Sequence, residues 1–362
     1  MLPRLFTECL VRPGDLEPSS PHLEVIGTFN PGAVRANDDV VLLVRVAERP
    51  AERPDGFVAL PRYAPDGRLV IDQVARDDVE FIDARGVRMR HDGAIRLTFV
   101  SHLRVVRLTA GGRSVASADG PRFMPSGPYE TYGVEDPRIT SLNGRYYFTY
   151  VAVSRWGAAT ALASTTDFRT FERHGIIFCC ENKDVVLFPG RIGGRYVALH
   201  RPNPSSHFSP PAMWLASSED LLDWGAHRPL ALAGNAPGDD ADGWDSGRVG
   251  AGCPPIATDR GWLEIYHGND RLESATDGDV GRYCGAAVLL DREDPGNVVA
   301  RGKGPVMVPQ EDCETRGFVP DVVFPTGIVE QDDTLLIYCG AADTHVTVVG
   351  LSQRHLLSRL EP

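Results

Sequence analysis

The sequence has no long apolar run. None of its apolar segments approaches the roughly 18 residues of a membrane-spanning helix, and the start MLPRLFTECLVRPGDLEP lacks the apolar core and cleavage site of a signal peptide. Basic charge is scarce too, because the 362 residues carry a formal net charge of −12 with the acids scattered along the chain. Nucleic acid and anionic membranes require a net basic face, so neither is expected as a partner. These absences predict a soluble, cytoplasmic protein.

Three further patterns are missing. The seven cysteines show neither CxxC spacing nor a pattern that indicates pairing, which predicts free thiols. The histidines lie at no metal-ligand spacing, so neither a metal nor an organic cofactor is expected. A sustained helical period is absent as well. Short alternating or β-branched segments bounded by Gly, Asp and Asn predict an all-β chain instead.

One unit recurs along the chain: a polar or charged head, a turn, and then a strand of apolar and aromatic residues. Clear copies lie at 28–49, 133–154, 183–202, 247–270 and 319–344. Such repeats are typical of the radial sheets of a β-propeller, in which each blade covers its neighbours. Residues 81–108 also fit the unit, either as an additional blade or as outer strands of the first one. A sandwich is the alternative, but it does not predict one unit along the whole chain.

The heads of the units are the place to look for chemistry, because the innermost strands of a propeller converge on a central channel. These heads carry Asn30, Glu135, Asp136, Arg138, Lys183, Asp184, Arg248 and Asp321, and the second strands end in Arg45, Arg201, His267 and Asp343. A few carboxylates beside several cations suit a polyhydroxylated ligand with an anion next to it. Structural alternatives stay open for each: the arginines as ion pairs between blades, His267 as a hydrogen-bonded core residue, and Asp136 as the end of a segment before Pro137.

Seven segments then resemble, in order and approximate spacing, the signature segments of glycoside hydrolase family 130: GVEDPRIT, KDVVLFP, LHRP, GAGCPPI, GWLEIYHG, VVFPTG and YCGAADT. That family contains β-mannoside phosphorylases and β-mannosidases on a five-bladed β-propeller. The resemblance implies five blades and a single catalytic domain over 27–354, with an N-terminal segment at 1–26 and a C-terminal tail at 355–362.

The resemblance also implies roles for single residues. Asp136 becomes the general acid, which in the family is thought to protonate the glycosidic oxygen through the 3-hydroxyl of the mannose. Asp343 would hydrogen-bond that sugar, with Asn30 and Arg45 as further contacts in the same pocket. Strand alternation places Arg138 on the same side as Asp136, where it either steadies Asp136 or reaches the substrate. The attacking phosphate would be bound by Lys183, Arg201, Arg248 and His267. Several phosphorylases of the family place Arg-Asn where this chain has Lys183-Asp184, and a carboxylate beside a dianion disfavours its binding.

The basic set favours phosphorolysis, because phosphate arrives as an anion and needs cations to hold it, whereas water must be activated by a second carboxylate. The sequence therefore predicts an inverting phosphorylase. It would cleave a non-reducing-end β-mannosyl linkage of a manno-oligosaccharide with inorganic phosphate and release α-mannose 1-phosphate, acting as a monomer or small homo-oligomer. The alternatives are an inverting β-mannosidase, whose base would be Glu264, Glu311, Glu314 or Asp321, and a non-catalytic carbohydrate-binding propeller.

Overall fold

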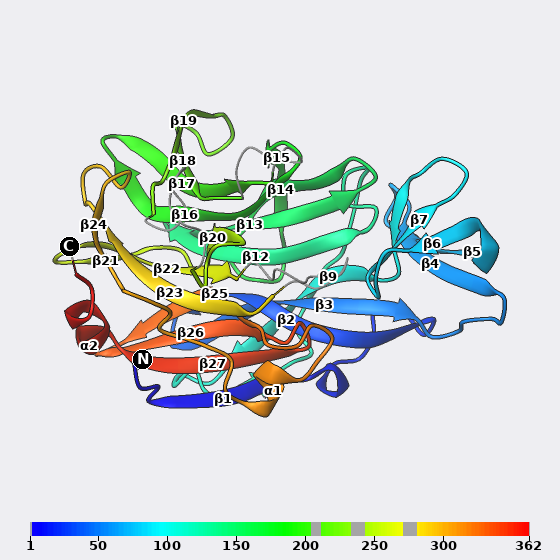
Figure 1. Cartoon of the computed structure of the whole chain (residues 1–362), viewed down its shortest axis with the longest axis horizontal. Helices are drawn as coiled ribbons and strands as arrows, with labels where there is room; N and C mark the ends of the chain where they lie inside the picture. Colours follow the sequence, from blue (N-terminus) through cyan, green and yellow to red (C-terminus); the bar gives the residue numbers. More distant parts are fainter. Residues whose placement is uncertain (1, 204–210, 233–242, 271–280, 362) are drawn as a thin grey trace.

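The fold is all-β with few helices, as the sequence predicts (Figure 1). The computed structural model describes residues 2–203, 211–232, 243–270 and 281–361. Its helical elements are the short turns η1 (Pro13–Asp15) and η2 (Arg76–Asp78) and the helices α1 (Asp312–Thr315) and α2 (Gln353–Ser358). In the part of the chain so described, no helix is long and apolar enough to cross a membrane. All seven cysteines are free thiols, three of them buried.

The largest sheet has nine strands in the order β15-β14-β13-β12-β9-β3-β2, with β10 and β11 also paired to β9. Its strands are β2 (Leu23–Ala36), β3 (Asp39–Pro50), β9 (Val100–Leu108), β10 (Val115–Ser117), β11 (Arg122–Phe123), β12 (Gly133–Leu142), β13 (Arg145–Ser154), β14 (Gly157–Thr165) and β15 (Glu172–Phe178). The two halves meet where β12 pairs with β9 in parallel, at Gly133 and Ser101. Within each half the strands pair antiparallel, so the sheet is two antiparallel groups joined at one point.

Two further sheets follow in the chain. The first has the order β16-β17-β18-β19 and the second the order β20-β22-β23-β24, with β21 paired to β22. Their strands are β16 (Asn182–Ile192), β17 (Arg195–Pro202), β18 (Trp214–Ser218), β19 (Trp224–Pro229), β20 (Arg248–Ala251), β21 (Ile256–Thr258), β22 (Gly261–Asn269), β23 (Tyr283–Leu290) and β24 (Val298–Arg301). Each sheet begins with one of the segments in which the sequence places a charged head.

The last large sheet joins the two ends of the chain. Its order is β1-β27-β26-β25, from β1 (Phe6–Val11), β25 (Val323–Gln331), β26 (Thr334–Ala341) and β27 (His345–Ser352). Phe6 lies opposite Gly350 in this pairing. The segment 1–26 therefore supplies the edge strand of a sheet whose other strands come from residues 323–352.

The sheets are packed face to face, which explains why several strands read as continuous apolar runs rather than as alternating ones. In β3 the side chains of Leu42 and Val44 pack against β26 and β27, whereas those of Val41 and Leu43 pack against β12 and β13. All four are fully buried. A strand buried on both faces needs apolar residues at every position, and the sequence VVLLV supplies them.

An insertion between β3 and β9 projects from one end of the body (Figure 1). It consists of a two-stranded sheet of β4 (Phe57–Tyr63) and β5 (Leu69–Ala75) and a three-stranded sheet of β6 (Val79–Phe81), β7 (Gly86–Met89) and β8 (Ile95–Leu97). The segment 81–108 is thus divided: its first part belongs to this insertion, and β9 is the third strand of the first group. The interpretation of 81–108 as an additional blade is wrong, because its strands do not form a separate four-stranded sheet.

Candidate active site

A cavity of about 400 Å³ lies where the heads of the first strands come together, a volume in the range of roughly 300–1,000 Å³ that is usual for small-molecule sites. All but two of the site residues predicted from the sequence line it: Asn30, Arg45, Asp136, Lys183, Arg201, Arg248 and Asp343. They come from β2, β3, β12, β16, β17 and β20 and from the turn after β26. Residues far apart in the sequence therefore meet at one site, as the repeated unit predicts.

In β2, β12 and β16 the polar head residue lies in a β-bulge. Asn30, Asp136 and Asp184 have φ angles of 47°, 50° and 53°, and the pairing of each strand with its neighbour shifts register at the same point. Positive φ is unfavourable for most side chains, but Asn and Asp tolerate it better than others. A bulge redirects one side chain while the strand continues on either side. This explains why a polar residue at the head of a buried strand can point into the cavity.

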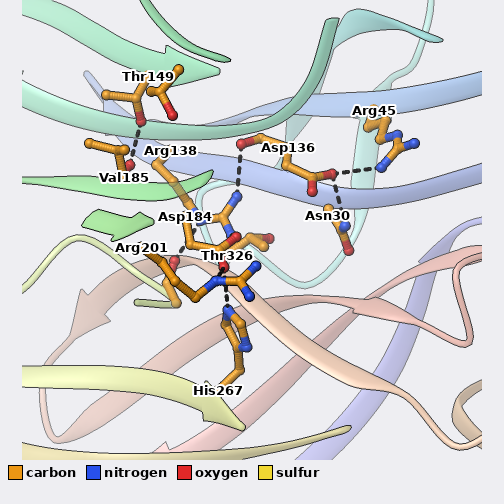
Figure 2. Close-up of polar contacts among 12 residues, drawn as sticks. Asn30, Arg45, Asp136, Arg138, Thr149, Asp184, Val185, Arg201, His267 and Thr326 are labelled. Atoms are coloured by element: carbon orange, nitrogen blue, oxygen red, sulfur yellow. Dashed lines mark hydrogen bonds and ion pairs between the residues drawn. The ribbon is translucent and has the colours of Figure 1, made fainter. Parts of the chain in front are cut away.

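Asp136 lies in a cluster centred on Arg45 (Figure 2). Arg45 Nη1 lies 3.0 Å from Asp136 Oδ1, and Arg45 Nη2 lies 2.7 Å from Glu135 Oε1. Asn30 Nδ2 donates to the same Asp136 oxygen over 2.9 Å. The guanidinium of Arg45 lies 4.5 Å from the centre of the Phe29 ring, which fixes its plane. Oδ1 of Asp136 thus accepts two hydrogen bonds, whereas Oδ2 accepts none from the described residues.

The carboxylates around Arg45 differ in their affinity for protons. Burial raises the pKa of Asp136, but the charges of Arg45 and Lys183 outweigh it and hold the pKa below its usual value. For Glu135, burial prevails over the charge of Arg45 and the pKa is raised. Burial likewise raises the pKa of Asp343 to about 6. The site therefore combines an ionised Asp136 with two carboxyl groups that take up protons more readily.

Asp184 holds a second cluster (Figure 2). Its Oδ2 accepts from Arg201 Nε over 2.7 Å and lies 3.2 Å from His267 Nε2, while Arg138 Nη2 lies 3.6 Å from its Oδ1. Burial raises the pKa of Asp184, but Arg201 and His267 hold it well below its usual value. Arg201 Nη1 is buried without a hydrogen-bond partner in the described part of the chain. Arg201 therefore lines the cavity while one of its donors is held by Asp184.

Arg138 and His267 are the two predicted site residues that do not line the cavity. Arg138 is fully buried; its Nε donates to Gly252 O over 2.7 Å and its Nη1 to the main-chain oxygen of Asp136 over 2.8 Å. His267 is fully buried against Asp184, and burial lowers its pKa. Both side chains lie behind the residues that face the cavity and hold two of them in place.

The sequence interpretation missed the contribution of the insertion. Its lining residues are Ile82, Asp83, Arg85, Gly86, Ile95 and Leu97. Arg85 Nη2 pairs with Asp83 Oδ2 over 2.5 Å, so one wall of the cavity carries a charged pair among apolar side chains. The charged residues of the segment FIDARG could have indicated a functional loop. Nothing in the sequence, however, indicates that this loop lies next to the heads of distant strands.

None of the four glutamates and aspartates considered as a hydrolytic base lines the cavity: Glu264, Glu311, Glu314 and Asp321. Glu264 is fully buried, its Oε1 accepts from Gly252 N over 3.1 Å, and burial raises its pKa well above the usual value. Glu314 is also fully buried and pairs with Arg4 over 2.7 Å. In the described ranges, no group of three or more metal-ligating side chains could hold a metal ion.

The comparison with protein families gives the class of the protein. The family model of glycoside hydrolase family 130, described as beta-1,4-mannooligosaccharide phosphorylase, matches residues 102–361. This is more than half of the chain, so the protein belongs to that family, and the resemblance in its sequence segments is confirmed.

Characterised relatives are mannoside phosphorylases. The chain is 40% identical over 357 residues to a beta-1,2-mannobiose phosphorylase of Listeria innocua, covering 97% of this chain and 96% of that one. A 1,2-beta-oligomannan phosphorylase of Thermoanaerobacter sp. is 38% identical over 241 residues, which are 66% of this chain and 74% of that one. The solved structure of the Listeria innocua enzyme in complex with beta-1,2-mannobiose superposes with a TM-score of 0.86 at 39% identity, covering 97% of this chain and 96% of the other.

Proposed function

We propose that the protein is an inverting β-mannoside phosphorylase, which cleaves a non-reducing-end β-mannosyl linkage with inorganic phosphate and releases α-mannose 1-phosphate. The observation that carries this proposal is the cation set Lys183, Arg201 and Arg248, which lines the same cavity as Asp136. An anionic nucleophile needs such cations and no base, whereas water needs a base and has no use for three cations. Both relatives named above act on β-1,2 linkages according to their names, so a β-1,2-linked mannoside is the proposed substrate.

Asp136 is the proposed general acid, acting through the 3-hydroxyl of the bound mannose. With the cavity empty, the surrounding cations hold the pKa of Asp136 below its usual value. A phosphate dianion beside Lys183 offsets part of that positive charge and raises the pKa of Asp136, because a nearby negative charge disfavours ionisation. Phosphate binding and protonation of the acid therefore support each other. Asn30, Arg45 and Asp343 are the proposed sugar contacts.

The carboxylate of Asp184, which on sequence grounds disfavours phosphate, has a positioning role in this proposal. Its oxygens are engaged by Arg201, His267 and Arg138, so its charge is compensated before any phosphate binds. It fixes the guanidinium of Arg201, which lines the cavity, through the bond to its Nε. His267 and Arg138 act through Asp184 and Asp136 instead of touching the ligands.

The five groups of strands are proposed to be the blades of a β-propeller, which takes most of its strands from the predicted domain 27–354 and β1 (Phe6–Val11), the strand that completes the last blade, from the segment 1–26. The groups are β2-β3-β9 with β10 and β11, β12–β15, β16–β19, β20–β24 and β25–β27 with β1. Their face-to-face packing and the meeting of their head residues at one cavity support this arrangement. The cytoplasmic location and the monomeric or small homo-oligomeric state stay predictions from the sequence.

The test is a product assay on β-1,2-mannobiose with and without inorganic phosphate. Phosphate-dependent formation of α-mannose 1-phosphate is expected, whereas release of mannose at the same rate without phosphate would identify a hydrolase. The variant Arg201→Ala should raise the KM for phosphate far more than the KM for mannobiose. Arg195→Ala is the matched control, because Arg195 lies on the same strand but pairs with the exposed Glu219 away from the cavity. Equal effects of the two substitutions would remove Arg201 from the phosphate site.

A further inference from the structure

The hairpin between β13 and β14 ends beside the cavity. Val153 lies opposite Ala158 across this hairpin, and both line the cavity. The next pair along, Ser154 and Gly157, closes the ladder, so Arg155 and Trp156 form the two-residue turn beyond the cavity wall. Trp156 is 63% exposed, more than any other large apolar side chain in the described residues.

The turn is held in a defined conformation. Trp156 N donates to Ser154 Oγ over 3.2 Å, and Ala158 N donates to Glu181 Oε1 over 2.9 Å. The guanidinium of Arg155 lies over the indole, 5.1 Å from its centre. A cation stacked on one face restrains the ring and leaves the other face open. The exposed indole is thus a fixed surface feature that lies next to a cavity for sugars.

A substrate longer than a disaccharide needs contacts beyond the cavity. The polar groups that would hold the terminal mannose are Asn30, Arg45, Asp136 and Asp343, and the cavity they line has a volume of about 400 Å³. The remaining sugars of a chain bound by its non-reducing end extend outward through the opening. Sugar rings present C–H groups on one face and hydroxyls at their edge, so an aromatic face beside the opening suits a sugar ring.

We propose that Trp156 is the stacking platform of an additional sugar subsite, which binds a residue of a longer β-mannoside on the leaving-group side of the cleaved bond. This inference rests on the proposed function. Arg155 supplies guanidinium donors beside the platform for the hydroxyls at the edge of that sugar. The indole is 63% exposed. Because its turn continues the cavity lining at Val153 and Ala158, a sugar is favoured over a second copy of this chain as the occupant.

The experiment compares kcat/KM for β-1,2-mannobiose, mannotriose and mannotetraose in Trp156→Ala, Trp156→Phe and the wild type. Loss of the indole should lower kcat/KM by about tenfold for the longer substrates and much less for mannobiose. Trp156→Phe should restore most of the loss, because it keeps an aromatic face. Leu222→Ala is the matched surface control: Leu222 is 44% exposed in the turn between β18 and β19 and does not line the cavity.

An equal loss on mannobiose and mannotetraose, or no loss on either, would overturn the subsite. A change in oligomeric state of Trp156→Ala, measured by size-exclusion chromatography, would assign the ring to an interface between copies. Calorimetric titration with mannotetraose and mannobiose in the absence of phosphate measures binding alone. It separates the two proposals: a tetraose preference that depends on Trp156 supports the subsite even if the wild type proves not to be a phosphorylase.

Discussion

Substitution of Asp184 by Asn tests the electrostatic arrangement of the proposed phosphate site. Asp184 is fully buried and its charge compensates Arg201, 2.7 Å away, and Arg138, 3.6 Å away. Asparagine keeps the shape and one acceptor oxygen but removes the charge, so both guanidinium groups stay buried without their counter-ion. Removing one partner of a buried ion pair costs about 3–5 kcal/mol. Because asparagine keeps an acceptor, we expect Asp184→Asn to lower the free energy of unfolding by about 3 kcal/mol.

Phosphate should restore part of that loss. An anion bound beside Arg201 supplies the missing negative charge, so the variant should gain more from phosphate than the wild type does. Ligand binding stabilises the folded state by about 2.7 kcal/mol at a hundred times the dissociation constant. The assay is urea unfolding with and without saturating phosphate, with Asp223→Asn, an exposed carboxylate, as control. A loss no larger than that of the control, or an equal phosphate effect in variant and wild type, would refute the reasoning.

Three other substitutions give separate predictions. Asp136→Asn should lower kcat by about 10²–10⁴-fold while sugar binding in calorimetry is retained, and a variant with normal turnover would show that Asp136 is not the acid. Burial raises the pKa of Asp343 to about 6 in the folded state, so this group keeps a proton that the unfolded chain releases near pH 4. The free energy of unfolding should therefore fall as the pH rises from about 4 to about 6. Asp343→Asn should flatten this pH dependence, measured by urea unfolding. Glu264→Gln should leave kcat within a few-fold of the wild type, since Glu264 does not line the cavity, and a large drop in kcat would show that Glu264 takes part in the reaction. Because burial raises the pKa of Glu264 in the folded state, the same variant should be more resistant to unfolding at high pH.

Much of the site could be predicted from the sequence because its polar heads recur at one position of a repeated unit. Asn30, Asp136 and Asp184 each interrupt a strand of buried apolar residues, and a buried polar residue in such a place needs a reason. The repeat supplied that reason without structural information: equivalent positions of equivalent units meet. The roles of these residues, in contrast, came from the family resemblance.

The limits of the sequence interpretation have a physical cause in the bulges. Simple strand alternation places Arg138 on the same side as Asp136, two positions earlier. The bulge at Asp136 shifts the register between Glu135 and Arg138, and the side chain of Arg138 lies behind the cavity, bonded to the main chain of Asp136. His267 lies behind the cavity as well. Periodicity assumes a regular strand and therefore fails where the backbone conformation is unusual.

The pairing of β1 with β27 has a consequence for the timing of folding during synthesis. Phe6 lies opposite Gly350, so β1 receives its partner only after all the residues between the two strands have been synthesised. Contacts between residues so far apart in sequence form slowly, because a long loop must close before they are gained. Asp343 lies in the turn between β26 and β27, directly beside this late partner. We therefore expect a nascent chain to complete its cavity only once β27 can pair with β1, which pulsed proteolysis of stalled chains of increasing length would detect as a sudden gain of protection.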